Sequence, residues 1–254
     1  MNIDLSDRRI LITGSSTGIG AAVARACALA GAAVTVHYHS SHEQARSLVD
    51  TLRAEGGRVH LVGGDVSKST EAARVVDDAA NAMGGLDVLV NNAGALVKRV
   101  PLGEIDDALY DTVLDLNVRS VVTASQAAVR HMQRARRGSI INTSSIAARN
   151  GGGPGTLLYA GAKAFVLNAT RNLAKELAAV NIRVNGVSPG VISTPFHDRY
   201  STPELLETMR KTIPMARLGE PADCVGAYLF FACDALSSYI TGQVLEVNGG
   251  QYMA

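Results

Sequence analysis

The stretch RILITGSSTGIG, residues 9–20, decides the fold of this 254-residue chain. Residues 9–13 form a short apolar run that ends at a glycine, which is the pattern of a buried parallel strand. A glycine turn and an alanine-rich segment follow, and residues 19–30 are expected to form a helix. Glycines between a strand and a helix let backbone N–H groups approach a pyrophosphate at the helix N-terminus. The spacing G-x-x-x-G-x-G departs from the common dinucleotide fingerprint G-x-G-x-x-G, so the turn alone does not establish a ligand.

Strand and helix patterns alternate along the rest of the chain. Further strands are expected at 33–38, 58–62, 87–90, 139–143, 182–187 and 244–247. Further helices are expected at 42–55, 69–83 (with Ser69 as N-cap), 104–131, 159–180 and 221–233. This alternation predicts an α/β fold, a single-domain Rossmann-like doubly wound parallel sheet of about seven strands with helices on both faces. Ligands bind such sheets at the carboxyl ends of the strands. Residues of unusual type follow strands at Gly14, Asp65, Asn91, Ser145 and Pro189.

Composition narrows the class of protein. With 47% hydrophobic and 19% charged residues, the chain is expected to form one domain, 1–254. A net charge of +1 gives no sign of a nucleic-acid or membrane partner. The three cysteines lack metal-binding spacing and lie in apolar stretches, which is typical of reduced core thiols in a cytoplasmic protein. The segment 1–7 is too polar for a signal peptide, and no apolar run is long enough to span a bilayer.

Tyr159 and Lys163 form the strongest chemical signal. They lie four residues apart in a predicted helix, so both side chains fall on one helix face. A fixed ammonium stabilises a phenolate, so the pair is expected to hold the pKa of the phenol below its ordinary value of about 10. Such pairs are also common on solvated helices, and the pair alone therefore does not identify a site. Asn117 is a further candidate, since a mid-helix Asn is costly to bury without partners, although most such residues are satisfied core amides.

In their order and spacing, the motifs resemble the classical short-chain dehydrogenase/reductase family over essentially the whole chain. The 3-oxoacyl carrier-protein reductases and the glucose dehydrogenases have the most similar overall pattern. The motifs are Thr13-Gly14-x-x-x-Gly18-x-Gly20, Asn91-Asn92-Ala93-Gly94, Asn117, Ser145, Tyr159-x-x-x-Lys163, Pro189-Gly190 with Thr194, and the C-terminal segment 240–250.

The resemblance implies an enzyme that interconverts a carbonyl and a secondary alcohol with a nicotinamide cofactor. Tyr159 would be the general acid or base, and Lys163 would lower its pKa and bind the nicotinamide ribose. Ser145 would position the substrate oxygen, and Asn117 would hold a water that relays protons. The residues that the resemblance places around the cofactor, besides Tyr159 and Lys163, are Gly14, Ser16, Thr17, Gly18, Ile19, Gly20, Tyr38, His39, Ser40, Asp65, Val66, Asn91, Ala93, Gly94, Pro189, Gly190, Ile192 and Thr194.

Two positions depart from the family pattern. The end of the second strand, Tyr38-His39-Ser40, has neither a carboxylate for a ribose 2′-hydroxyl nor an arginine for a 2′-phosphate. We expect NADP(H) to be favoured, with NAD(H) as the alternative. The interval from Ser145 to Tyr159 is one residue longer than in many members, so Ser144 remains an alternative to Ser145.

Substrate, assembly and competing functions are less well defined. Candidate substrate residues are Ser145, Leu96, Ile146, Asn150 and Leu157, with a lid at about 191–216. They include no arginine cluster, which favours a neutral ketone, sugar or acyl thioester. Apolar helices at 108–131 and 159–180 are expected to form a homotetramer, with a dimer as the alternative. An epimerase or dehydratase of the extended branch would need a longer chain. A redox sensor or scaffold that binds dinucleotide without turnover would typically lack the Tyr or the Lys.

Overall fold

The computed structural model describes residues 3–253, and Met1, Asn2 and Ala254 of the predicted domain lie outside the described residues. Seven strands form one parallel sheet in the order β3-β2-β1-β4-β5-β6-β7. The order reverses between β1 and β4, which creates the crevice where ligands of such sheets bind. The strands are β1 (Arg9–Ile12), β2 (Ala33–Tyr38), β3 (Arg58–Gly63), β4 (Val88–Asn91), β5 (Gly138–Thr143), β6 (Ile182–Pro189) and β7 (Val244–Val247).

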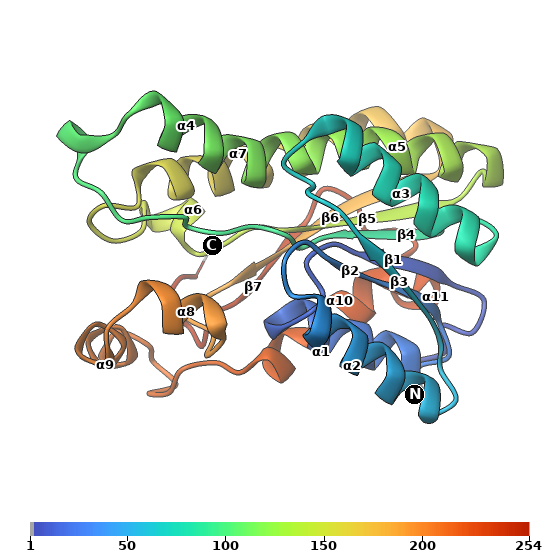
Figure 1. Ribbon diagram of the computed structural model, residues 1–254, viewed down its shortest axis with the longest axis horizontal. Helices are drawn as coiled ribbons and strands as arrows, with labels where there is room; N and C mark the ends of the chain where they lie inside the picture. Colours follow the sequence, from blue (N-terminus) through green and yellow to red (C-terminus); the bar gives the residue numbers. More distant parts are fainter. Residues whose placement is uncertain (1–2, 254) are drawn as a thin grey trace.

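Helices cover both faces of this sheet, as Figure 1 shows. One layer consists of α1 (Gly18–Leu29), α2 (His42–Ala54) and α10 (Pro221–Ala232), and the other of α3 (Ser69–Met83), α5 (Ser120–Ala135) and α7 (Leu157–Leu177). The shorter helices are α4 (Asp107–Leu114), α6 (Ala147–Asn150), α8 (Pro195–Tyr200), α9 (Pro203–Lys211) and α11 (Asp234–Ser237). In Figure 1, α4, α6, α8 and α9 gather at the left end of the molecule. The predicted fold class is thereby confirmed.

The strand that opens the fold shows why the sheet is buried on both sides. Ile10 and Ile12 pack in the core cluster under α1 and α10, whereas Leu11 packs in the cluster under α3 and α5. Alternate side chains of a strand point to opposite faces, so a strand between two helix layers is buried on both of its faces. β5 and β6 are buried along their entire lengths for the same reason.

The helices that contain Asn117, Ser69 and Tyr159 differ from the sequence expectation in ways that bear on the site. The helix expected at 104–131 is interrupted, because α4 and α5 are joined by a π-helical turn, Asp115–Arg119. Asn117 lies in that turn, and such turns often mark functional sites in helices. Ser69 is the first residue of α3 rather than its N-cap, which is Lys68. The helix that carries Tyr159 begins two residues earlier than expected, at Leu157, and ends in a 3-10 turn at Ala178–Val180.

Two further properties bear on the expected partners. Of the helices in residues 3–253, none has the length and apolar character that crossing a bilayer requires. Across the same residues, no group of three or more His, Cys, Asp or Glu side chains is placed to hold a metal ion. Cys27, Cys224 and Cys233 are buried free thiols.

Candidate active site and dinucleotide crevice

The glycine turn after β1 has room for backbone only. Gly14 and Gly18 have φ angles of 63° and 57°, in the left-handed region that favours glycine. A Cβ on Gly14 would lie 2.9 Å from the Cα of Ala93, and a Cβ on Gly20 would lie 2.5 Å from the carbonyl oxygen of Gly14. The turn is therefore pressed against the end of β4 and the start of α1, and any side chain would displace it.

The N-terminus of α1 is suited to an anion. Its N-cap is Thr17, which is extended and makes no side-chain cap, and the first turn of the helix carries no acidic residue. The first N–H groups of a helix have no partner within the helix and carry the positive end of its dipole. Together with the turn's close backbone packing, this arrangement fits the pyrophosphate of a dinucleotide. Ser16, Thr17, Gly18 and Ile19 are all partly exposed there.

His37 is a positioning residue that the sequence reasoning missed. The Gly14 N–H donates to His37 Nδ1 at 2.9 Å, so the neutral ring carries its proton on Nε2, which lies 3.0 Å from the Gly64 carbonyl. Burial lowers the pKa of His37 to about 4, so it remains neutral at physiological pH. The side chain thus ties the glycine turn to the ends of β2 and β3. A buried polar residue at the end of an apolar strand was the only signal in the sequence.

The end of β4 is fastened to the same turn. The Asn92 amide donates to the carbonyls of Thr13 and Gly14 at 3.0 and 2.9 Å, and the Thr13 hydroxyl accepts from the Asn92 and Ala93 N–H groups. The amide of Asn91, in contrast, is buried and donates to the side chains of Ser125 and Asn142. The Asn91 side chain is therefore a structural element of the sheet rather than a free cofactor ligand.

The ends of β2 and β3 lie beside the glycine turn, to which His37 connects them. The Tyr38 ring lies over Gly63, where a Cβ would come within 2.7 Å of the ring. His39 and Ser40 are exposed. Val66, which follows Asp65 in the sequence, is buried. Although burial opposes it, hydrogen bonds from Ser67 hold the pKa of Asp65 below its ordinary value. The charged carboxylate of Asp65 is thus already engaged by Ser67.

Lys163 and Tyr159 meet where β5 ends. Lys163 is 3% exposed, and its Nζ donates to the Thr143 carbonyl at 2.9 Å. The ammonium lies 5.8 Å from the centroid of the Tyr159 ring. The expected i,i+4 juxtaposition on one helix face is therefore present, and the pair faces the end of the sheet rather than solvent.

The direction of the Tyr159 pKa differs from the sequence expectation. Burial raises the pKa of Tyr159 to about 12, and the Ser145 hydroxyl beside it only partly opposes that rise. Burial also lowers the pKa of Lys163 to about 8. Desolvation disfavours the charged form of each group, and it is the largest cause of both shifts. The prediction of a lowered phenol pKa was wrong for this structure because it ignored how deeply the pair is buried.

Asn117 is held rigidly beside Lys163. Its amide donates to the carbonyls of Ala95 and Val113, both at 2.9 Å, and its side-chain oxygen accepts from the Ala95 N–H at 3.2 Å. A Cβ on Gly94 would lie 2.7 Å from that oxygen and 3.0 Å from Lys163 Nζ. Gly94 thus occupies the narrow space between the amide and the ammonium. The side chain of Asn117 is satisfied by backbone groups, as a core amide would be.

The two candidate serines have different surroundings. The Ser144 hydroxyl is buried and donates to the backbone carbonyl of Lys163 at 3.0 Å, which fixes β5 to α7. Ser145 is partly exposed, and its hydroxyl accepts from the Ala147 N–H at 3.1 Å. A hydrogen bond with the Ser145 hydroxyl also lowers the pKa of Tyr159, against the larger opposite effect of burial. The geometry therefore favours Ser145 as the serine that faces a substrate.

The segment after β6 returns to the glycine turn. Pro189 ends the strand, and the Gly190 N–H donates to the Val247 carbonyl at 2.9 Å. Ile192 is buried and pairs with Gly219 in an isolated bridge. A Cβ on Gly18 would lie 3.4 Å from the methyl group of Thr194, so this segment closes over the start of α1. The structure thus brings the predicted Thr194 next to the predicted phosphate turn.

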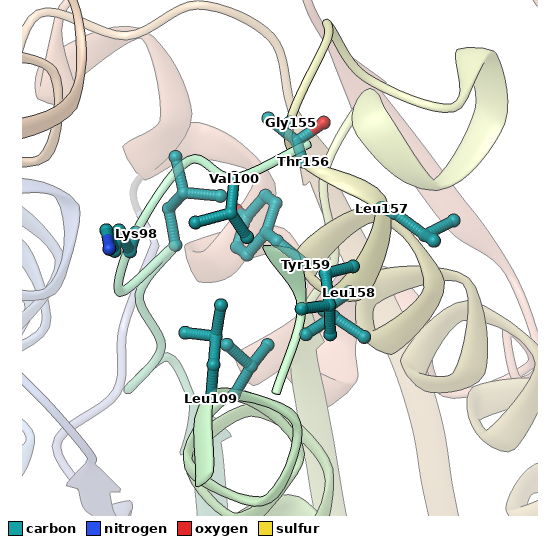
Figure 2. Close-up of a pocket in the computed structure, with 11 residues that line it drawn as sticks. Lys98, Val100, Leu109, Gly155, Thr156, Leu157, Leu158 and Tyr159 are labelled. Carbon is teal, nitrogen blue, oxygen red and sulfur yellow. The ribbon is translucent and has the colours of Figure 1, made fainter. Parts of the chain in front are cut away.

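The predicted substrate residues do not all lie together. Figure 2 shows a small cavity in which Val100, Leu158 and Tyr159 face one another, and Leu96 and Leu157 also line it. Ser145, Ile146 and Asn150 are absent from this lining. Ile146 is buried at the start of α6, and Asn150 is exposed with its side chain accepting from the Gly152 N–H.

Arg99 is a second residue that the sequence reasoning missed. Its Nε donates to the Tyr200 carbonyl at 2.9 Å and its Nη1 to the Pro154 carbonyl at 3.2 Å. The guanidinium therefore joins α8, in the expected lid, to the glycine-rich loop before Tyr159. In the sequence it had no signal, because an isolated arginine in a loop is most often solvated.

Comparison with known proteins agrees with this geometry. Residues 14–251 match the sequence profile of the family described as Enoyl-(Acyl carrier protein) reductase. The 3-oxoacyl-[acyl-carrier-protein] reductase FabG of Staphylococcus aureus is 38% identical over 243 residues, which cover 96% of this chain and 97% of the relative. The chain belongs to the short-chain dehydrogenase/reductase family. The family resemblance of the motifs is confirmed, and membership makes the protein an oxidoreductase of the CH–OH/C=O class.

Solved structures of the short-chain dehydrogenase/reductase family superimpose over nearly the whole chain. The NADH-dependent reductase A1-R′ responsible for alginate metabolism is 40% identical with a TM-score of 0.90, covering 98% of this chain and 100% of its own. A gluconate 5-dehydrogenase from Burkholderia cenocepacia, in complex with NADP and tartrate, is 31% identical with a TM-score of 0.91, covering 98% and 97%. A dinucleotide cofactor is therefore established for the family of this fold. The first of these two relatives is described as NADH-dependent, and the second is described in complex with NADP.

Proposed function

We propose that this protein interconverts a carbonyl and a secondary alcohol by hydride transfer, with Tyr159 as the general acid and base. The observation that carries the proposal is the pair formed by buried Lys163 and partly buried Tyr159, which lies with Ser145 at the end of β5, next to the glycine turn. The glycine cradle at Gly14 and the uncapped start of α1 fit a dinucleotide. When bound, the nicotinamide supplies or accepts the hydride.

The side chains of the protein then transfer one proton to or from the substrate oxygen. With a pKa of about 12, Tyr159 is protonated at neutral pH and can donate to the oxygen of a carbonyl that is being reduced. Ser145 positions that oxygen. Lys163 is charged below its pKa of about 8, and its ammonium favours the phenolate left behind and would hold the ribose of a bound nicotinamide cofactor. Asn117 and Lys163 flank Gly94, which supports the role of Asn117 in a proton path from the lysine.

The test is the variant Tyr159→Phe, assayed for NADPH and NADH absorbance loss with a panel of ketones. We expect kcat to fall at least about 100-fold because general acid catalysis is lost, while cofactor affinity, measured by fluorescence titration, remains nearly unchanged. A variant that kept most of the wild-type turnover would remove Tyr159 from this role. A wild-type protein that bound cofactor but turned over no ketone would instead support the sensor or scaffold.

For the cofactor we propose that NADP(H) is favoured and NAD(H) is possible. The support is the end of β2, where Tyr38, His39 and Ser40 offer no carboxylate that would repel a 2′-phosphate. Asp65, whose carboxylate interacts with His39, is held by Ser67 and lies 3.6 Å from Lys68. The ratio of kcat/KM for NADPH and NADH measures the preference directly, and a tenfold or greater preference for NADH would contradict the proposal.

We also propose a cytoplasmic homotetramer, with a dimer as the alternative, and a substrate lid at about 191–216. The support for assembly is a set of large apolar side chains that the fold leaves exposed. Tyr110 on α4, Phe165 on α7 and Leu245 on the edge strand β7 are all more than 40% exposed. Self-complementary faces of this kind usually close as symmetric oligomers. Light scattering that gave a monomer mass at micromolar concentration would refute the assembly. The two short helices α8 and α9 form the lid.

A further inference from the structure

Arg99 occupies the space between two segments that border the catalytic tyrosine. One is the glycine-rich loop, where a Cβ on Gly155 would lie 3.4 Å from the Arg99 side chain, and the other is α8. In Figure 2, Val100, the residue after Arg99, lies near Gly155 and Tyr159, and Lys98, the residue before it, lies farther away on the same segment. The guanidinium thus lies at the junction of loop and lid rather than on an open surface.

Aromatic rings connect this junction to the reacting phenol. The Phe196 ring lies 5.7 Å from the Tyr159 ring and 5.0 Å from the Tyr200 ring, centroid to centroid. Tyr200 is the residue whose carbonyl accepts from Arg99. Phe196 thus links the reacting phenol to the residue that holds Arg99.

Arg99 differs from the other arginines that are partly withdrawn from water. Arg8 and Arg183 pair with Asp234, Arg9 and Arg137 pair with Asp87, and Arg149 pairs with Glu246. Within residues 3–253, no carboxylate lies within ion-pair distance of Arg99, whose two partners are neutral carbonyls. A guanidinium has more N–H groups than two carbonyls use. Removing such a charge from water without an anionic partner is costly.

The surrounding titratable groups do not neutralise it. Burial, and then the charge of Arg99, hold the pKa of His197 below its ordinary value, so that ring is neutral at pH 7. Asp198 is exposed and forms no ion pair with Arg99 among the described residues. Burial without a compensating carboxylate also lowers the pKa of Arg99 itself. The charge at this junction is therefore positive and uncompensated.

We propose that Arg99 binds a carboxylate of the substrate, so that the preferred substrates are oxo acids or keto sugar acids rather than neutral ketones. This inference rests on the proposed carbonyl–alcohol activity. It replaces the sequence expectation of a neutral substrate, which was based on the absence of an arginine cluster. Planar guanidinium groups bind carboxylates through parallel N–H···O bonds, and the N–H groups that Arg99 does not donate to Tyr200 and Pro154 supply them.

The experiment compares matched acids and esters. The probes are acetoacetate, levulinate, 5-oxohexanoate and 5-ketogluconate, each beside its methyl ester, with the wild-type enzyme and with Arg99→Gln, Arg99→Lys and Arg199→Gln. For at least one pair we expect the wild type to prefer the acid, and Arg99→Gln to lower the acid-to-ester ratio of kcat/KM by about 10- to 100-fold. Arg99→Lys keeps the positive charge but lacks the two parallel N–H donors of the guanidinium, so its acid-to-ester ratio should lie between those of the wild type and Arg99→Gln. Arg199, an exposed arginine on the same helix as Tyr200, controls for a general field effect and should leave the ratio unchanged.

Each outcome has a defined meaning. If Arg99→Gln lowered acid and ester equally, Arg99 would only fasten the lid to the loop, and the inference would be overturned while the proposed activity stood. Wild-type preference for every ester would overturn it as well. If no ketone were turned over, the proposed function would fail. Calorimetry would still test whether Arg99 binds a carboxylate. Levulinate binding to the NADP⁺ complex, lost in Arg99→Gln, would support carboxylate binding, and equal binding by both proteins would refute it.

Discussion

Replacing Lys163 with methionine removes a positive charge that the fold holds almost completely away from water. The side chain is 3% exposed, and its pKa falls from an ordinary 10.5 to about 8. At about 1.4 kcal/mol for each tenfold change in proton affinity, this difference corresponds to about 3 kcal/mol of unfavourable free energy in the charged folded state. Methionine has a similar length and no charge, so the variant removes this term while filling the same space.

The sign of the pH effect follows from linkage. Below about pH 8, Lys163 is protonated in both the folded and the unfolded chain, and the wild type bears the full cost. Between about pH 8 and 10.5, the unfolded chain binds the proton that the folded chain has lost, so wild-type stability rises with pH. We expect the free energy of unfolding of the wild type, minus that of Lys163→Met, to rise by about 2 kcal/mol from about pH 7 to about pH 9.5.

Urea unfolding, followed by circular dichroism at one protein concentration and several pH values, measures this difference. Groups that titrate in both proteins cancel on subtraction. Asn117→Ala is the matched control, because it alters the same site and leaves the ammonium in place, so it should keep the wild-type slope. A difference that stayed flat over this range would mean that the Thr143 carbonyl, which accepts from Nζ at 2.9 Å, compensates fully for burial. The argument for a desolvated lysine would then be wrong.

Three further outcomes are expected. Tyr38→Asp should shift the NADPH-to-NADH ratio of kcat/KM towards NADH, because a carboxylate repels a 2′-phosphate and accepts from a 2′-hydroxyl; an unchanged ratio would remove this position from cofactor choice. Gly14→Ala should weaken cofactor binding in fluorescence titrations and cost about 1–2 kcal/mol of stability, since it combines a φ of 63° with a contact at 2.9 Å; wild-type affinity would contradict the close packing of the turn. Alcohol oxidation should accelerate as pH rises above neutral, because a Tyr159 with a pKa of about 12 is a poor base at pH 7; stopped-flow rates that did not depend on pH would argue against it.

The sheet was predictable because its signals are local. Each strand is an apolar run between glycines or polar residues, and β1, with Ile10 and Leu11 facing opposite helix layers, needs no distant information to be identified. The glycine turn, the β4 end and the Tyr159–Lys163 spacing were likewise readable, since each motif lies within a few residues. Their assembly into one crevice follows from the parallel order of the strands.

What the sequence did not reveal depends on burial and on contacts distant in sequence. The π-helical turn at Asn117 interrupts a helix whose composition looks continuous, because the amide bonds to Ala95 in another segment. His37 belongs to none of the sequence motifs, yet it bonds to the glycine turn and to the residue after β3. Arg99 had no local pattern at all, since its partners lie 55 and 101 residues away.

Burial also determines the direction in which the proton chemistry is easiest. The same withdrawal from water that raises the pKa of Tyr159 lowers that of Lys163, so each group is biased towards its neutral form. A neutral phenol still carries the proton that a developing alkoxide needs, whereas it must first lose that proton before it can act as a base. The fold therefore prepares Tyr159 as an acid and leaves its basic form to be generated. If Arg99 binds a substrate carboxylate, as we propose, the carbonyl of that substrate meets a phenol that is already protonated. Both features favour reduction of an anionic carbonyl compound at neutral pH.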